Sequence, residues 1–128
     1  MGNPAAKQGD TIVASDMHQI QPPAPASPAL IPHPFNGIID NGLCQSVFIM
    51  GLPSATQNST ATNTPAHIPS GGTFVIPPTN MATIASGSTT VMIGGNPAAR
   101  NGDTADTCDD SGVKQGGTII ASGTVMIG

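Results

Sequence analysis

The chain has 128 residues and carries few charges: three cations, seven aspartates and no glutamate, for a formal net charge of -4 at pH 7. Three scattered cations cannot neutralise a run of phosphates, so nucleic acid is excluded as an expected partner. No stretch approaches the roughly 18 consecutive apolar residues of a membrane-spanning helix, and the length predicts a single domain over residues 1–128.

The composition predicts a thin hydrophobic core. The chain has no Trp, no Tyr and three Phe, whereas Gly and Pro number 16 and 13. Large aromatic side chains normally supply much of the buried area of a small domain, and their scarcity leaves Val, Ile, Met and Ala for that task. A compact fold of this composition needs a staple, which can be a metal, a disulfide or a partner protein.

The N-terminal segment and the cysteines bear on the compartment in which the protein folds. Residues 1–10 lack the apolar run of a secretory signal, so we expect synthesis and folding in the cytoplasm, with export only if another component carries the protein out. Cys44 and Cys108 could form one disulfide. In a chain without an export signal, metal binding or inert burial is the better interpretation.

The dominant pattern along the chain is a segment that occurs three times. Asn-Pro-Ala-Ala-Lys-Gln-Gly-Asp-Thr at 3–11 recurs as Asn-Pro-Ala-Ala-Arg-Asn-Gly-Asp-Thr at 96–104, and a weaker copy, Leu-Pro-Ser-Ala-Thr-Gln-Asn-Ser-Thr, occupies 52–60. A short leading strand precedes the second and third copies, and the strand that the first copy lacks stands at the end of the chain. These strands are residues 47–51, 91–95 and 125–128. If the last strand leads into the first copy, the three units close into a ring and the termini lie side by side.

The segments between the copies predict strands and long loops. Residues 22–34 are too rich in Pro for a helix or a central strand, and the polar, Thr-rich residues 58–69 predict a second loop. A β-prone run precedes each leading strand, at 38–42, 83–87 and 118–123; in the first of these runs, Asn41-Gly42 is a hairpin signal. We therefore expect a mostly β fold of three short β-hairpin units with pseudo-threefold symmetry, long loops and little or no helix; the resemblance described below implies that these units form a small cone.

The histidines and one cysteine predict a metal site. When the copies are aligned on their final Thr, His18 and His67 fall at the same offset, and Cys108 lies three residues before the matching Ser111. The segments that follow the three copies, called prongs here, would bring these side chains towards one axis, with His33 available from the first long loop. Three imidazoles and one thiolate complete a tetrahedral zinc set; the alternative is that each histidine is a solvated loop residue. A structural Zn²⁺ of this kind keeps no position for a substrate, and its binding energy becomes folding energy.

Other polar residues predict no chemistry of their own. Cys44 matches no repeat position and is interpreted as a buried or half-buried thiol. Asp106, Asp109 and Asp110 surround Cys108 and could form a carboxylate site. In a turn rich in Gly and Thr, such residues more often cap backbone amides and face solvent. The chain has no Walker-type phosphate loop and no nucleophile elbow.

The repeat resembles that of a known family. Residues 96–103, followed by Cys108 and a closing Gly-x-Val-x-Ile-Gly, are similar to the PAAR-repeat proteins, which are named for that four-letter motif. The loops at 33–37 and 64–69 look like the PAAR-like subset associated with contractile injection systems, and the resemblance spans essentially the whole chain. The copy at 52–60 departs from the motif, since it lacks the Arg and the following Gly-Asp.

The resemblance implies a conical, β-rich, non-enzymatic monomer on the blunt end of a trimeric, VgrG-like β-helical spike, which it sharpens for membrane puncture. It also implies a zinc near the apex, held by three His and one Cys, which in this sequence are His18, His33, His67 and Cys108. We expect contact with the target membrane to be transient, and effector cargo to be a separate molecule because the chain ends at its last strand. Type VI secretion systems and extracellular, phage-tail-like particles both use such caps, and the long loops favour the extracellular kind.

Two alternative functions remain open at this point. A small zinc-dependent hydrolase or deaminase would need an open metal position and a general base, for which Asp would have to replace the absent Glu. A free-standing adhesin or binding module would be a soluble monomer without affinity for a trimeric spike.

Overall fold

The computed structural model of the protein describes residues 2–128, and the regular structure in this part of the chain consists of strands. No residue of this part is helical, which confirms the expectation of a mostly β fold. Residues 2–128 accordingly contain no helix of the length and apolarity needed to cross a membrane. The strands are β1 (Asn3–Pro4), β2 (Thr11–Gln21), β3 (Ala29–Asn41), β4 (Cys44–Ile49), β5 (Leu52–Ser54), β6 (Thr60–Asn63), β7 (Thr73–Phe74), β8 (Met81–Ile84), β9 (Met92–Ile93), β10 (Asn96–Pro97), β11 (Thr104–Asp106), β12 (Gly117–Ile120) and β13 (Met126–Ile127).

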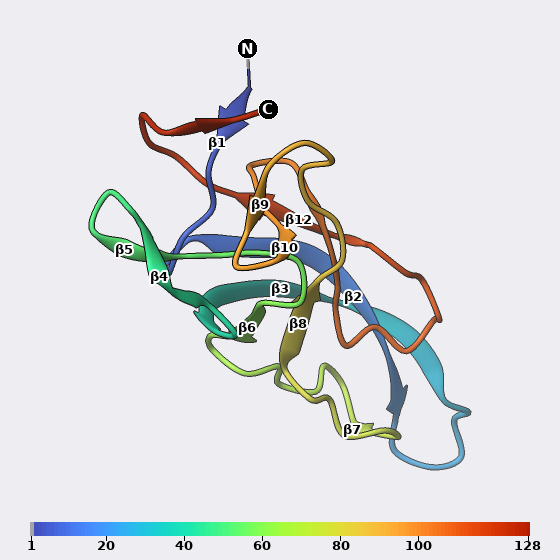
Figure 1. Ribbon diagram of the computed structural model, residues 1–128. Coiled ribbons are helices and arrows are strands. Elements are labelled where there is room, and N and C mark those ends of the chain that lie inside the picture. Colours follow the sequence, from blue (N-terminus) through green and yellow to red (C-terminus); the bar gives the residue numbers. More distant parts are fainter. Residues whose placement is uncertain (1) are drawn as a thin grey trace.

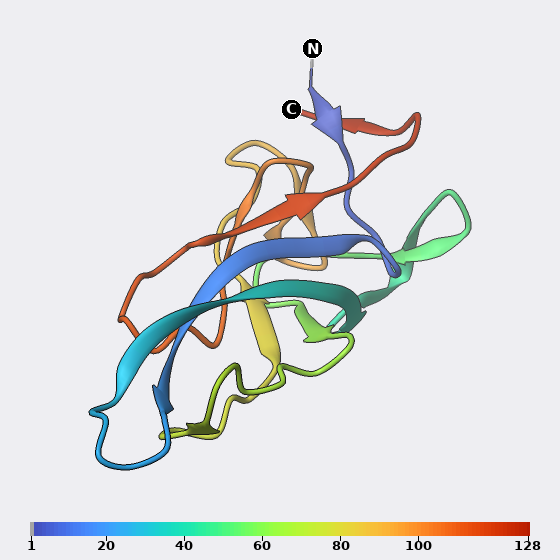
Figure 2. The ribbon, with the colours of Figure 1, turned by 180° about the vertical axis from the view of Figure 1, so that it is seen from behind.

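Six antiparallel strands close into a partial barrel at the centre of the molecule (Figures 1 and 2). Around the ring, the order is β2, β3, β6, β8, β11, β12 and back to β2. Strands β2, β6 and β11 each follow one copy of the repeated segment, and they alternate with β3, β8 and β12, which contain residues of the β-prone runs. Each of the three predicted units therefore contributes two strands to the barrel.

Three two-stranded sheets lie outside the barrel. Each joins a leading strand to its copy of the repeat: β4 pairs with β5, β9 with β10, and the last strand β13 with the first strand β1. The β13–β1 pair places the two ends of the described chain side by side, as ring closure predicts (Figure 1). The prediction of a hairpin at Asn41-Gly42 is wrong, because β3 pairs with β2 and β6 and not with β4. Gly42, at a φ of 68°, instead links the barrel to the separate β4–β5 sheet.

The starts of the three copies form a cyclic set of backbone hydrogen bonds. The amide of Ala6 donates to Ala99, that of Ala99 to Ala55 and that of Ala55 to Ala6, at 2.9, 3.1 and 3.0 Å. All three alanines are fully buried, and their small side chains let three backbones approach one another. Isolated bridges between copies follow the same cycle: Ala5 with Arg100, Lys7 with Ser54, and Thr56 with Ala98. The weak middle copy is therefore a full member of the pseudo-threefold arrangement.

The turn that ends each copy shows how the middle one keeps the fold without Gly-Asp. Gly9 and Gly102 have φ values of 91° and 89°, in the left-handed region that glycine adopts without strain. Asn58 takes the same place with a φ of 80°, and Asn is among the non-glycine residues that best tolerate this region. Ser59 replaces the aspartate: its Oγ accepts the amide of Thr56 at 3.0 Å, as the carboxylates do in the other two copies.

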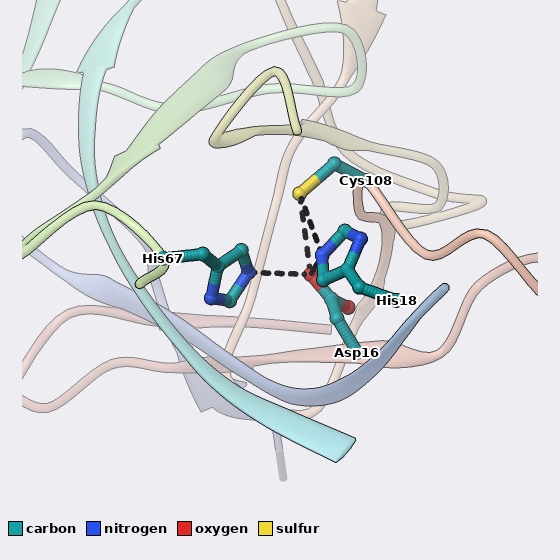
Figure 3. Close-up of side chains that lie close together, drawn as sticks. All are labelled: Asp16, His18, His67 and Cys108. Atoms are coloured by element: carbon teal, nitrogen blue, oxygen red, sulfur yellow. Dashed lines mark hydrogen bonds and ion pairs between the residues drawn. The ribbon is translucent and has the colours of Figure 1, made fainter. Parts of the chain in front are cut away.

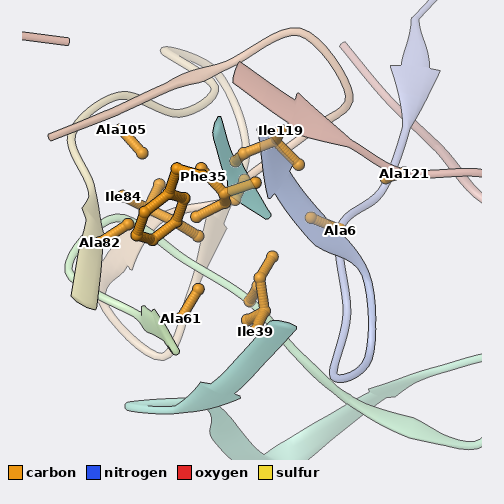
Figure 4. Packing of buried hydrophobic residues seen from close by; sticks show 12 residues of the cluster. Ala6, Phe35, Ile39, Ala61, Ala82, Ile84, Ala105, Ile119 and Ala121 are labelled. Carbon is orange, nitrogen blue, oxygen red and sulfur yellow. The ribbon is translucent and has the colours of Figure 1, made fainter. Parts of the chain in front are cut away.

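The core inside the barrel consists of Ile and Ala side chains around one aromatic ring, Phe35 (Figure 4). Ile39, Ile84 and Ile119 occupy equivalent positions in the three units and are fully buried. Gly37 makes room for the ring, because a Cβ at this position would lie 2.7 Å from Cε1 of Phe35. The core is therefore thin, as the composition predicts.

Two segments predicted as loops contain strands. β6 lies within 58–69, and β3 begins at Ala29 and includes Pro32 and Pro34. The prolines are compatible with a strand because β3 pairs with β6 only from Gly37 onwards. Its first half thus has one unpaired edge, where a residue without an N–H is tolerated. The resulting long β2–β3 hairpin extends away from the end of the molecule that holds the termini (Figures 1 and 2).

Candidate metal centre

The β2–β3 hairpin brings three polar side chains into the interior. Asp16, His18 and His33 have exposed fractions of 1, 0 and 4 %. Asp16 lies directly opposite His33 in the strand register. Because side chains alternate between the two faces of a strand, His18 lies on the same face as Asp16.

Loops that follow the two other repeat strands supply two more side chains. His67 follows β6, and its backbone amide donates to Oδ1 of Asn80 at 2.8 Å, which ties this loop to the residue before β8. Cys108 follows β11. All three prongs of the pseudo-threefold arrangement therefore reach the same region.

The loop that carries Cys108 takes the place of a neighbouring strand along β2. The carboxylates of Asp109 and Asp110 accept two β2 amides at 2.8 and 3.0 Å, so they cap amides as predicted, although they are half-buried and do not face solvent freely. Oδ2 of Asp110 also lies 3.2 Å from Nδ1 of His18, an ion-pair distance without hydrogen-bond alignment. A carboxylate on this side favours the proton on Nδ1 and leaves the Nε2 lone pair for a metal.

Four potential ligand atoms meet between these segments (Figure 3). They come from Asp16, His18, His67 and Cys108, and all lie within 4.8 Å of one another. Oδ2 of Asp16 is 3.2 Å from Nε2 of His67, 3.4 Å from Sγ of Cys108 and 4.0 Å from Nε2 of His18. Nε2 of His18 and Sγ of Cys108 are 3.7 Å apart. With bonds of about 2.0–2.3 Å, two ligands of a tetrahedral metal are about 3.3–3.8 Å apart. Three of the four spacings lie in or next to this range and the Asp16–His18 distance of 4.0 Å lies just outside it, so the side chains are close to the arrangement of donors that share one ion.

His33 lies against this cluster. The centroid of its ring is 5.5 and 5.7 Å from those of His18 and His67. Its Nδ1 donates to the carbonyl oxygen of Ile31 at 2.8 Å, which leaves the lone pair on Nε2. This Nε2 is buried and has no hydrogen-bond partner within residues 2–128, which is unfavourable unless an ion provides one. A backbone carbonyl on the outer nitrogen is also the usual companion of a metal-binding imidazole. The side chains present thus fit a bound metal ion.

Burial and two phenylalanines shape the electrostatics of the site. The ring of Phe74 lies 5.6 Å from two of the imidazoles, and that of Phe35 lies 6.0 Å from the third. Burial lowers the pKa of His67, with Asp16 opposing the shift, and raises the pKa of the Cys108 thiol to about 11. In the absence of metal, His67 is therefore neutral and Cys108 protonated at pH 7, and a metal that binds the sulfur would displace a proton.

The structure brings together three of the four residues expected as ligands, His18, His67 and Cys108, and packs the fourth, His33, beside them. It also adds Asp16, which the sequence reasoning missed. A signal was available, because Asp16 precedes His18 by two residues in a segment that forms a strand. The two side chains of such a pair lie on the same face.

Cys44 stands apart from this site, on β4. It is half-buried, as expected, and its Sγ lies 3.3 Å from Oγ of Ser46, a contact that lowers its pKa. Both cysteines of the chain are free thiols. The alternative of a disulfide is therefore not realised.

Comparison with known proteins agrees with the repeat pattern. The family model described as PAAR motif matches residues 1–113 of the chain. No curated protein matches the chain. The family match covers all three copies of the repeated segment and every residue of the candidate metal centre.

Proposed function

Because the chain belongs to the PAAR motif family, whose members are structural tips on the spikes of contractile injection systems, we propose that it caps and sharpens a trimeric spike for membrane puncture. In this proposal the protein catalyses no reaction. Force from the contracting machine reaches the tip through the spike, and the tip must stay folded while it is driven forward. The observation that carries the proposal is a pseudo-threefold set of exposed apolar side chains, one on each of the three leading strands.

The part of the molecule formed by the three leading strands, called the base here, carries one exposed apolar side chain at the same position of each strand. Phe48, Met92 and Met126 have exposed fractions of 56, 57 and 55 %. The residue that follows each of them is an Ile, at most 8 % exposed. These three Ile side chains pack together with Ala5 and Ala98 in a second core cluster beneath the base. The exposed side chains are thus displayed from a fixed platform.

A partner with true threefold symmetry is the simplest match for the base. Three identical subunits offer three identical pockets, and each can receive one of the three exposed side chains. Large apolar side chains near the centre of an interface contribute most of its binding energy, and Met adapts easily to a pocket of irregular shape. The edges of the three two-stranded sheets also offer backbone groups for pairing with strands of a β-helical partner. We therefore propose a trimeric β-helical spike protein as the partner, with one copy of this chain per trimer.

We propose that a structural Zn²⁺ holds the other end of the molecule rigid. His18, His33, His67 and Cys108 would hold it, joining β2, β3 and two loops. When bound, the ion supplies cross-links in a chain whose main core contains one aromatic ring. A structural zinc contributes on the order of 10 kcal/mol of apparent binding free energy, which is comparable with the whole stability of a typical domain.

Burial supports a structural role for the ion over a catalytic one. Asp16, His18 and His33 are at most 4 % exposed, and the pocket that borders His33 and His67 is lined by no carboxylate of residues 2–128 that could act as a general base. A hydrolytic site keeps an open metal position next to a cleft. We further propose that effector cargo is a separate molecule and that the machine is an extracellular, phage-tail-like particle assembled from cytoplasmic components.

Binding to the spike tests the role of the base. The variant Phe48→Ser/Met92→Ser/Met126→Ser should bind the trimeric spike protein of the same injection system at least tenfold more weakly, as expected for the loss of apolar anchors. The control Ile68→Ser/Val113→Ser removes two side chains that are 75 and 57 % exposed on other loops and should bind as the wild type does. Equal binding by wild type and base variant, measured by calorimetry on folded proteins, would contradict the proposed docking face.

Metal analysis tests the zinc clamp, the name used here for a Zn²⁺ held by His18, His33, His67 and Cys108. Purified wild-type protein should contain one equivalent of zinc, and His67→Ala and Cys108→Ser should lose it. Cys44→Ser provides the matched control, because it removes a thiol that lies outside the cluster, and it should keep the metal. A metal-free wild type, or zinc retained equally by all four proteins, would count against the clamp.

A further inference from the structure

We infer that Asp16 is a fifth protein donor to the metal, so that the ion is held by three imidazoles, one thiolate and one carboxylate. The inference rests on the proposed zinc clamp and extends it. It concerns a residue that the ligand set expected from the sequence does not contain. The copy at 96–104 is followed by an aspartate at the same offset, Asp109, but this side chain accepts the amide of Met17 and lies outside the cluster. The contacts of the Asp16 carboxylate carry the argument.

Without metal, three donors satisfy this carboxylate. Thr107 donates its hydroxyl to Oδ1. Nε2 of His67 lies 3.2 Å from Oδ2, and Sγ of Cys108 donates to the same oxygen at 3.4 Å. Asp16 is 1 % exposed, so water does not replace these partners. The carboxylate is therefore stable only while side chains of the cluster point their hydrogens at it.

Binding of a metal to the cluster removes two of these three hydrogen bonds. A nitrogen or sulfur that binds a metal uses its lone pair for that bond, and the metal takes the position of the hydrogen that it would have donated. His67 and Cys108 would then leave Oδ2 of Asp16 buried without a partner, and the Cys108 thiolate would stand beside it. A buried carboxylate in that state is strongly unfavourable unless a positive charge compensates it. The ion itself is the compensating charge at hand, and Oδ2 already lies among its other ligand atoms.

The same reasoning keeps His33 in the set. Its Nδ1 is occupied by the carbonyl of Ile31, and its buried Nε2 has no hydrogen-bond partner within residues 2–128. Asp16 and His33 are cross-strand neighbours in the β2–β3 register, so one ion can reach both. Asp16 and His33 therefore complement each other as ligands, and neither replaces the other. Thr107 holds Oδ1 and orients the carboxylate so that Oδ2 faces the cluster.

X-ray absorption at the zinc edge and optical spectra of the cobalt-substituted protein test this inference. Wild-type protein should show four nitrogen or oxygen donors and one sulfur, and its cobalt form should have the weaker visible bands of a five-coordinate ion. Asp16→Asn and Asp16→Ala should retain the metal with affinity lowered about tenfold or more, lose one light donor and gain the stronger bands of a tetrahedral ion. His33→Gln should also lose one light donor. Asp106→Asn, which changes the last residue of β11 outside the cluster, should match the wild type.

The possible outcomes separate the two proposals. A wild type with three light donors and one sulfur, whose spectra do not change in Asp16→Asn, would overturn the role of Asp16 and leave the zinc clamp standing. A wild-type spectrum that changes in Asp16→Asn but not in His33→Gln would overturn the five-donor set in favour of Asp16 as a replacement for His33. Wild-type protein that binds neither zinc nor cobalt would overturn both proposals.

Discussion

Two buried serines in the middle copy of the repeat give a sharp test of the packing around the pseudo-threefold axis. Ser54 and Ser59 are both 0 % exposed and lie five residues apart. The Oγ of Ser59 accepts the amide of Thr56 at 3.0 Å and donates to the carbonyl of Gly42 at 2.8 Å. The Oγ of Ser54 is buried without a hydrogen-bond partner in the described chain. Substitution by Ala should therefore have opposite effects at the two positions.

The magnitudes follow from the hydrogen bonds. An unpaired buried polar group costs about 1–3 kcal/mol, so Ser54→Ala should raise the free energy of unfolding by about 1 kcal/mol. The Cys44 thiol lies opposite Ser54 in the β4–β5 pair, but sulfur is a weak hydrogen-bonding group and offsets little of this cost. The other two copies already have Ala at this position. Ser59→Ala leaves an amide and a carbonyl unpaired and should lower the free energy of unfolding by about 2 kcal/mol.

Guanidinium unfolding at a fixed concentration of free zinc measures both effects, because a ligand that binds only the folded state adds the same contribution to each protein at constant free concentration. The unfolding midpoint should rise for Ser54→Ala and fall for Ser59→Ala, with an unchanged slope. A lower midpoint for Ser54→Ala, similar to that of Ser59→Ala, would refute the reasoning that the two hydroxyls differ in their partners.

Three further predictions concern the turns, the site and its support. Asn58→Gly should raise the free energy of unfolding by about 0.5 kcal/mol, because it relieves a residue at positive φ, and Gly102→Ala should lower it by about 1 kcal/mol; chemical denaturation checks both. Burial lowers the pKa of His67 below its ordinary 6.5, so in the metal-free protein the unfolded state takes up this proton first as pH falls. The stability contribution of His67 is complete above about pH 6.5 and is lost as pH falls through the lowered pKa. Melting temperatures measured from about pH 7.5 to about pH 5, on both sides of the ordinary histidine pKa, should show this loss, and His67→Gln should flatten the dependence. Asp110→Asn should weaken zinc binding about tenfold in competition with a chelator, whereas Asp106→Asn should not.

The repeated segment made much of the base predictable from the sequence. Each copy places Ala at the point where three backbones meet, and the leading strands repeat Val-x-Ile, so the number of units, the closure of the ring and the pairing of the termini follow from the sequence pattern. The weak copy was harder to evaluate, because Asn58 and Ser59 replace Gly-Asp by a different route to the same turn. Their equivalence lies in backbone φ and in one accepted hydrogen bond, which letter-by-letter alignment does not reveal.

The region beyond the base was less predictable. Pro32 and Pro34 indicated a loop, since proline excludes a central strand, and the sequence did not reveal that this half of β3 would have an unpaired edge. The same long hairpin brings Asp16 against His33, a pairing set by strand register over a separation that local patterns do not determine. Asp16 was therefore missed, although its spacing from His18 was in plain view.

The contrast between the two ends of the molecule has a common physical cause. At the base, three units that present equivalent side chains suit a partner with three equal subunits, and sequence differences between the copies are small there. A single metal ion imposes the opposite condition, because three equivalent prongs supply three donors and a closed zinc site needs at least four. The long β2–β3 hairpin would resolve this mismatch: it extends one unit past the other two and carries the candidate donors Asp16, His18 and His33, while the shorter prongs carry one candidate donor each, His67 and Cys108. In the proposed assembly, symmetry is therefore kept where a symmetric partner would bind and broken where one ion would hold all three units together.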